Sequence, residues 1–126
     1  MKPIVWIAFI VVLIISVVGT QWYKRSTFNK LLKCLQNQDF DKFFTILDSL
    51  ACKYFFAPFN REHMRLNAFF MMGDSTKIRE QFDLILNMRI NKKQRLDVCM
   101  KAFYFYVDEE DKVKAKEILD RMQGVT

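Results

Sequence analysis

An apolar segment at the start of this 126-residue chain, residues 4 to 19, reads IVWIAFIVVLIISVVG and carries no charge. Extended through Tyr23 it is long enough, at about 1.5 Å per helical residue, to span the roughly 30 Å hydrocarbon core of a bilayer. Aromatic rings favour the interface and basic residues favour headgroups or water. We therefore expect residues 1–23 to be a transmembrane anchor in contact with lipid and residues 24–126 to be a separate domain. The residues expected at the membrane boundary are Trp22, Tyr23, Lys24 and Arg25.

Basic residues around this segment predict its orientation. Lys2 precedes it, whereas Lys24, Arg25, Lys30 and Lys33 follow it closely. Because cytoplasmic flanks are enriched in Lys and Arg, we expect a single-pass protein with its amino terminus outside and its carboxyl-terminal domain in the cytoplasm. The alternative is a secretory signal cleaved near Gly19, although the apolar run is longer than a typical signal core.

Cysteine content and net charge agree with a cytoplasmic domain. Cys34, Cys52 and Cys99 are odd in number and have no spacing typical of metal ligands, which favours a reducing compartment. The chain has 20 Lys and Arg against 14 Asp and Glu, a net charge of +6. Many of the excess basic residues lie beside the apolar segment and can contact anionic lipid. A nucleic-acid partner is not expected, because such proteins carry a denser basic stripe.

The rest of the chain has the pattern of an all-α protein. Past the apolar segment only Pro58, Gly73 and Gly124 interrupt it, and apolar residues recur at spacings of three and four, as in Phe43, Leu47 and Leu50. We expect about six antiparallel helices after the anchor, with a new helix starting at Pro58. Further helix ends are expected at Gly73, Asp74 and the Asn91/Gln94 capping box.

These helices align as three pairs. Asp39, Asp74 and Asp111 fall in one column, at spacings of 35 and 37 residues. Other columns hold Phe43, Ile78 and Ala115; Leu47, Phe82 and Leu119; Leu31, Leu66 and Phe103; and Cys34, Phe69 and Tyr106. A helical hairpin that recurs with this period resembles the tetratricopeptide (TPR) repeat of about 34 residues.

The resemblance implies three stacked TPR-like hairpins whose first helices form a groove for a peptide or a helix. In that family the second helix carries a small residue in its first turn. Ala115 fits this position, whereas Phe43 and Ile78 are bulky and imply wider helix packing. An irregular helical bundle is the alternative, because amphipathic helices align with one another to some extent by their period alone.

Aromatic residues are unusually frequent, with 13 Phe in the chain, and several are adjacent in sequence. Neighbouring residues on a helix point about 100° apart, so one face cannot bury both. Most of these rings are expected in the core, and the others mark a surface for a protein partner. The candidate partner-binding residues are Phe55, Phe56, Phe59, Phe70, Met71, Met72, Tyr104 and Tyr106.

No catalytic motif is present in the sequence. It contains neither GxSxG nor a glycine-rich phosphate loop, and its one histidine, His63, has no cysteine or second histidine near it. Four acids from Asp108 to Asp111 are typical of a turn and a helix start. We therefore expect no enzymatic activity, no cofactor and no metal site.

Together these features predict a membrane-anchored helical adaptor or scaffold that binds a protein partner at the cytoplasmic surface. One alternative is a small structural subunit of a membrane complex, whose neighbours would contact the small residues Ser16 and Gly19. Another is a membrane-anchored immunity protein, which the small size and the anchor would suit.

Overall fold

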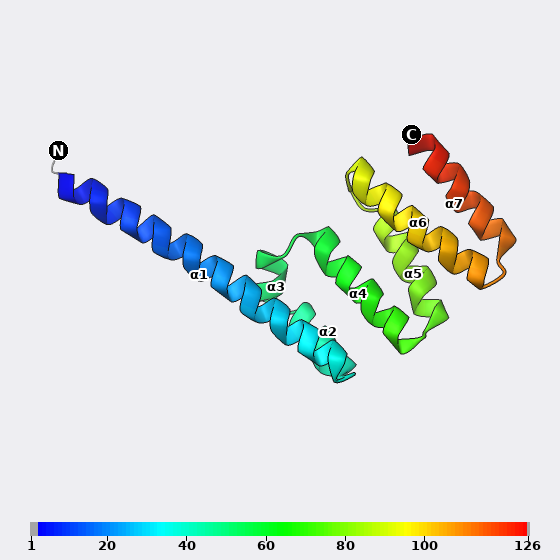
Figure 1. Cartoon of the computed structure of the whole chain (residues 1–126), viewed down its shortest axis with the longest axis horizontal. Coiled ribbons are helices and arrows are strands. Elements are labelled where there is room, and N and C mark those ends of the chain that lie inside the picture. The colour runs from blue at the N-terminus through cyan, green and yellow to red at the C-terminus, as the bar shows by residue number, and fades with distance from the viewer. Residues whose placement is uncertain (1–2, 126) are drawn as a thin grey trace. The chain divides into compact units, whose positions relative to one another are not determined.

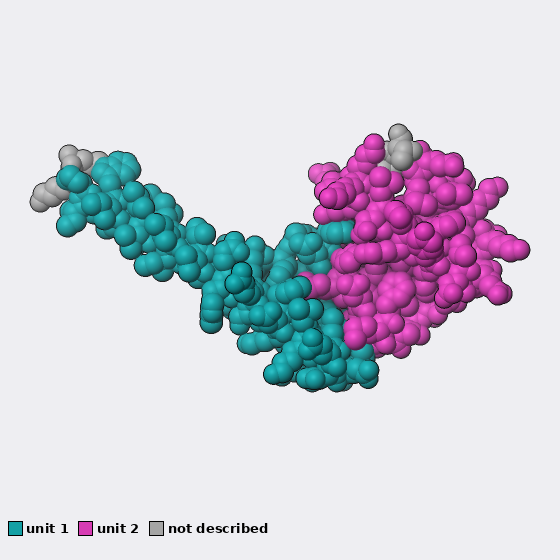
Figure 2. All heavy atoms as spheres, viewed as in Figure 1, with its two compact units in different colours: residues 1–61 teal, residues 62–126 magenta. Residues whose placement is uncertain are grey.

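The computed structural model describes residues 3–125, and every regular element in this part of the chain is an α-helix (Figure 1). The expected all-α fold is thus confirmed. The chain divides into two compact units, residues 1–61 and residues 62–126, which Figure 2 colours separately. The helices are α1 (Pro3–Gln36), α2 (Phe40–Leu47), α3 (Leu50–Phe55), α4 (Pro58–Met72), α5 (Ser75–Leu86), α6 (Lys92–Asp108) and α7 (Lys112–Val125).

Helix α1 has 34 residues, which corresponds to a length of about 51 Å. Its side chains from Ile4 to Val18 are all exposed, and among the described helices it is the one long and apolar enough to cross a membrane. No proline or helix-ending glycine lies between Thr20 and Gln36, so the helix does not stop at the end of the apolar segment. The helix expected to follow the anchor is therefore continuous with it.

The carboxyl-terminal third of α1 provides one wall of the core in the first unit. Thr27, Leu31 and Cys34 are buried on one face of α1, where the helix packs against α2 and α3. Buried partners on these shorter helices are Phe43 and Leu47 of α2 and Cys52 of α3. The helix that carries the apolar segment thus continues into the core of the first unit.

One structural difference from the expected helices lies at Ser49. Its hydroxyl accepts a hydrogen bond from the Cys52 N–H at 3.3 Å and donates one to the Ile46 carbonyl oxygen at 2.7 Å. A serine in this position caps the start of a new helix. The segment between Asp39 and Phe55, which contains no glycine or proline, is therefore divided into α2 and α3.

In the second unit, the most extensive packing between helices is that of α6 against α7. Ala115 is buried in the first turns of α7, and its small side chain allows the two backbones to approach closely. Helix α5 carries the bulkier Ile78 at the aligned position and makes fewer close backbone approaches to α4. Side chains bridge α4 and α5 instead, through the Phe70 and Phe82 rings at 5.9 Å and through Gln81 Nε2, which donates to the Glu62 carbonyl oxygen at 2.9 Å.

Three turns share one backbone geometry, and they lie at the three aligned positions of the sequence. Each contains a residue with positive φ: Gln38 (57°), Gly73 (70°) and Glu110 (59°). The N–H of the following aspartate then bonds to the carbonyl oxygen five residues earlier, as in the Schellman motif that ends many helices. These bonds are Asp39 to Cys34 at 2.8 Å, Asp74 to Phe69 at 3.3 Å and Asp111 to Tyr106 at 2.9 Å.

The same three aspartates begin the next helices. Their carboxylates accept hydrogen bonds from the backbone N–H groups of Lys42, Lys77 and Lys114, three residues further on. The Asn91/Gln94 capping box at the start of α6 is confirmed, with its two hydrogen bonds at 2.7 and 3.1 Å. The grouping of the helices into three TPR-like hairpins stays a prediction, which this recurring turn supports.

Candidate partner-binding site

An open groove of about 670 Å³ lies in the second unit, between α4 and α6. Apolar side chains on its rim are accessible: Tyr104 is 66 % exposed, Val107 50 % and Phe70 41 %. The groove brings together two of the predicted partner-binding residues, Phe70 and Tyr104, from two different helices. Its lining residues are Asn67, Phe70, Lys101, Tyr104, Phe105, Val107 and Asp108.

The position of Phe70 is fixed by the aromatic core beneath it. Its ring packs edge-on against Phe82 at 5.9 Å and Phe105 at 5.8 Å, and both of these rings are buried. One part of Phe70 therefore stabilises the core and another part faces the groove. On α6, residues 101, 104, 105 and 108 follow the helical spacing of three and four, which places them on one face. Tyr104 has no such anchorage in the core and stands at the exposed side of the groove.

One end of the groove carries a small polar network. Lys101 Nζ lies 2.6 Å from His63 Nε2 and 3.1 Å from Asp97 Oδ2. Burial lowers the pKa of His63, the nearby Lys101 ammonium lowers it further, and Asp97 acts in the opposite direction. His63 is therefore held as a neutral ring that accepts a hydrogen bond from Lys101. The Lys101 ammonium on the groove lining is thus balanced by Asp97, while Asp108 provides a negative charge elsewhere on the same lining.

Tyr106 is buried, so it does not lie on the exposed partner-binding surface where we expected it. It is only 1 % exposed. Its ring packs against Phe82 and Phe105, and the Arg79 guanidinium lies 5.0 Å over it. This burial also raises the pKa of Tyr106. Tyr106 is thus a core residue of the second unit.

The other predicted partner-binding residues lie outside the groove lining. Met71 and Met72 are exposed at the carboxyl-terminal end of α4. Phe55, Phe56 and Phe59 belong to the first unit and are half-buried. The Phe55 ring contacts Tyr23 at 4.8 Å, which attaches α3 to α1. Phe56 lines a hollow of about 590 Å³ along α1, together with Val17, Val18, Gln21, Trp22, Lys24, Arg25 and Phe28.

The predicted membrane-boundary residues occupy different environments on α1. Trp22 and Arg25 are exposed, Lys24 is half-buried, and Tyr23 lies against Phe55. Further toward the amino terminus, Ser16 and Gly19 are both exposed on the apolar segment. The Thr20 hydroxyl donates a hydrogen bond to the Ser16 carbonyl oxygen at 2.8 Å, so this polar group is satisfied within the helix.

Five groove residues are absent from the predicted set: Asn67, Lys101, Phe105, Val107 and Asp108. Their signal is present in the sequence as the spacing of Lys101, Tyr104 and Asp108 on one helical face. A selection of aromatic residues alone cannot find Asn67, Lys101, Val107 or Asp108, because the groove is also lined by polar and aliphatic side chains.

Among residues 3–124, no three His, Cys, Asp or Glu side chains gather in a way that could hold a metal ion. The groove between α4 and α6 is open, with an exposed apolar rim and charged residues on its lining. It is therefore suited to a polypeptide segment rather than to a small enclosed ligand. No protein-family model, curated protein or solved structure matches this chain. The chemistry of the groove is therefore known from the chain's own residues alone.

Proposed function

We propose that this protein is a single-pass membrane adaptor, in which α1 is the anchor and the groove between α4 and α6 binds a protein partner. The observation that carries the proposal is the shared groove of Phe70 and Tyr104, with Val107 on the same rim. Exposed aromatic and apolar patches of this kind are typical of protein interfaces. Tethering at a membrane raises the effective concentration of the partner, so even a weak groove can support assembly.

The lining of the groove also indicates the kind of segment it would accept. An apolar side chain would pack between Phe70 and Val107, which lie on α4 and α6. A basic group on the partner would pair with Asp108, and a hydrogen-bond acceptor would pair with the donor that Lys101 retains beside Asp97 and His63. We therefore propose an amphipathic helix or peptide with a basic group at one end as the bound element.

The proposed topology places the carboxyl-terminal domain in the cytoplasm. Support comes from the basic residues that follow the apolar segment and from the three cysteines, which are all free and buried. Exposed basic side chains at the start of this region include Arg25, Lys30 and Lys33.

The test is partner recovery with the full chain in mild detergent, measured by quantitative mass spectrometry. Phe70 is a poor choice for substitution because its ring also packs in the core. The variant is instead Tyr104→Ser with Val107→Ser, two exposed positions whose substitution leaves the core unchanged. We expect recovery of the partner to fall about tenfold or more, since losing two interface contacts costs about 1–2 kcal/mol.

The matched control is Val113→Ser on α7, a side chain that is 79 % exposed and lies outside the groove. It should recover the partner as the unmodified chain does. If the groove variant retains the same partners, the adaptor proposal is wrong. Retention of a stoichiometric membrane partner by that variant would favour the structural-subunit alternative, with contacts at Ser16 and Gly19.

A further inference from the structure

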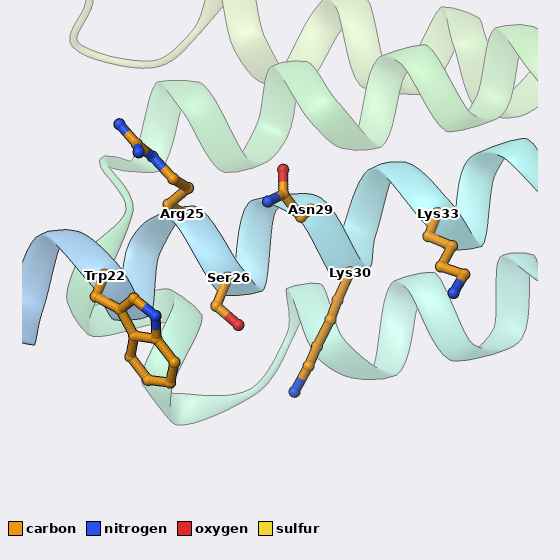
Figure 3. Close-up of a pocket in the computed structure, with 6 residues that line it drawn as sticks. All are labelled: Trp22, Arg25, Ser26, Asn29, Lys30 and Lys33. Atoms are coloured by element: carbon orange, nitrogen blue, oxygen red, sulfur yellow. The ribbon is translucent and has the colours of Figure 1, made fainter.

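A second candidate site, rich in basic residues, lies in the first unit just beyond the apolar part of α1. A hollow of about 370 Å³ runs along one face of this helix and is lined by Trp22, Arg25, Ser26, Asn29, Lys30 and Lys33. In Figure 3 the side chains of Trp22, Ser26 and Lys30 form a row along one side of α1, and Lys33 extends to the same side. The spacing of these residues is three or four, so they form one continuous stripe.

A neighbouring hollow of about 630 Å³ between α1 and α2 shares two of these residues, Lys30 and Lys33. From α2 it gains Lys42 and Thr45, and from the turn before α3 it gains Ser49. Lys30 and Lys33 therefore line both hollows. The remaining lining residues of the second hollow are Tyr23, Thr27, Cys34, Asn37, Asp39 and Ile46.

The charge of this region is strongly one-sided. Arg25, Lys30, Lys33 and Lys42 line the two hollows, and among the described residues none of these four side chains forms an ion pair. The one acidic lining residue is Asp39, whose carboxylate accepts the backbone N–H of Lys42 at 3.3 Å. The hollows thus have a net positive charge and favour an anion.

Distance along α1 places Lys30 and Lys33 beyond the apolar segment, on the side where the headgroups lie. Lys30 and Lys33 lie eight and eleven residues after Trp22, about 12 and 16 Å along the helix. Side chains on a helix lean toward its amino terminus, and long basic side chains extend further to reach a membrane surface. In Figure 3 the Lys30 side chain extends in this direction, toward the headgroups, which occupy about 5–8 Å on each side of the hydrocarbon core.

We propose that the site shared by Lys30 and Lys33 binds the phosphate headgroup of an anionic phospholipid, in the leaflet where α1 leaves the bilayer. Lys42 adds positive charge from α2, and the Ser26 hydroxyl provides a neutral hydrogen-bond donor. Arg25 and Asn29 line the first hollow but extend to the other side of α1 in Figure 3. Trp22 packs against the glycerol region, where an amphipathic ring is favoured. The proposal rests on the membrane anchor of the proposed function and is independent of the groove between α4 and α6.

The experiment uses the full chain with Trp6→Phe, which leaves Trp22 as the one tryptophan of a chain that has two. The protein is reconstituted in phosphatidylcholine vesicles that contain an equal mole fraction of either brominated phosphatidylglycerol or brominated phosphatidylcholine. Bromine quenches tryptophan fluorescence at contact, so the two quenching curves report which lipid lies beside Trp22. We expect about a fivefold enrichment of the anionic lipid, the effect of one favourable lysine contact at the surface.

Two variants separate a defined site from general attraction to a charged surface. Lys30→Gln with Lys33→Gln should abolish the enrichment. The matched control, Lys53→Gln with Lys92→Gln, removes the same charge from exposed positions outside both hollows and should keep the enrichment. Circular dichroism checks that both variants retain their helix content.

Equal quenching by the two lipids, or an equal loss in the control variant, would overturn the headgroup site and leave the anchor intact. Absence of quenching by either lipid would overturn the anchor and the site together.

Discussion

At the residue scale, the turn geometry places unequal demands on three aligned positions. Gly73 adopts a positive φ without cost, whereas Gln38 and Glu110 adopt the same conformation with a Cβ atom present. The chain therefore contains backbone strain at two turns that it avoids at the third.

We predict that Glu110→Gly stabilises the protein by about 0.5–1 kcal/mol, because glycine removes the steric cost of the left-handed conformation. The measurement is the denaturation midpoint of the full chain in detergent, followed by circular dichroism. Asp108→Gly is the control: Asp108 ends α6, and glycine there should lower the midpoint. A midpoint that falls in both variants would contradict the turn geometry.

His63 gives a prediction about pH. Burial and the Lys101 ammonium lower the pKa of His63, so between its folded value and the ordinary value of 6.5 the unfolded chain binds more protons. The contribution of His63 to the free energy of unfolding is therefore complete above about pH 6.5 and is lost as the pH falls through the folded pKa. As the chain has one histidine, its NMR titration is unambiguous. Lys101→Met should raise the pH of the His63 titration midpoint. A titration midpoint above pH 6.5 in the unmodified chain would be inconsistent with this environment.

At the element scale, local signals predicted most helix ends. Asp39, Asp74 and Asn91 cap helices as expected, because their side chains act on amides only three residues away. The break at Ser49 could not be predicted, since no glycine or proline marks it. The burial of Tyr106 could not be predicted either. Adjacent aromatic residues on α6 face different directions, and packing against Phe82 decides which one is buried.

The close packing of α6 against α7 gives an element-scale prediction at Ala115. Replacing this buried residue by Leu inserts volume between two closely packed helices and should cost about 1–3 kcal/mol. Lys116→Leu is the control, because Lys116 is exposed one position further along α7. Equal unfolding midpoints for the two variants would show that Ala115 does not set the helix spacing.

At the scale of the whole molecule, one continuous helix joins the apolar segment to the folded domain. Thr27, Leu31 and Cys34 of α1 are part of the core of the first unit. The first unit is therefore attached to the apolar segment without a flexible linker at residue 23.

The proposed orientation can be tested by cysteine labelling. The three native cysteines are buried, so the reporter is Lys92→Cys at an exposed position at the start of α6. A membrane-impermeant maleimide should modify this cysteine only after the cells are permeabilised. Ready modification in intact cells would reverse the topology and remove the support for a cytoplasmic partner.

The adaptor claim is tested most directly by placing a photo-crosslinking amino acid at Tyr104 of the full chain in intact cells. Parallel samples carry it at Ser16 in the apolar segment and at Val113 on α7. The account predicts one defined adduct at position 104, between this chain and a soluble partner protein. The same adduct should be absent at position 113. Adducts from position 16 alone, with none from position 104, would contradict the adaptor and identify the chain as a subunit held by its membrane helix.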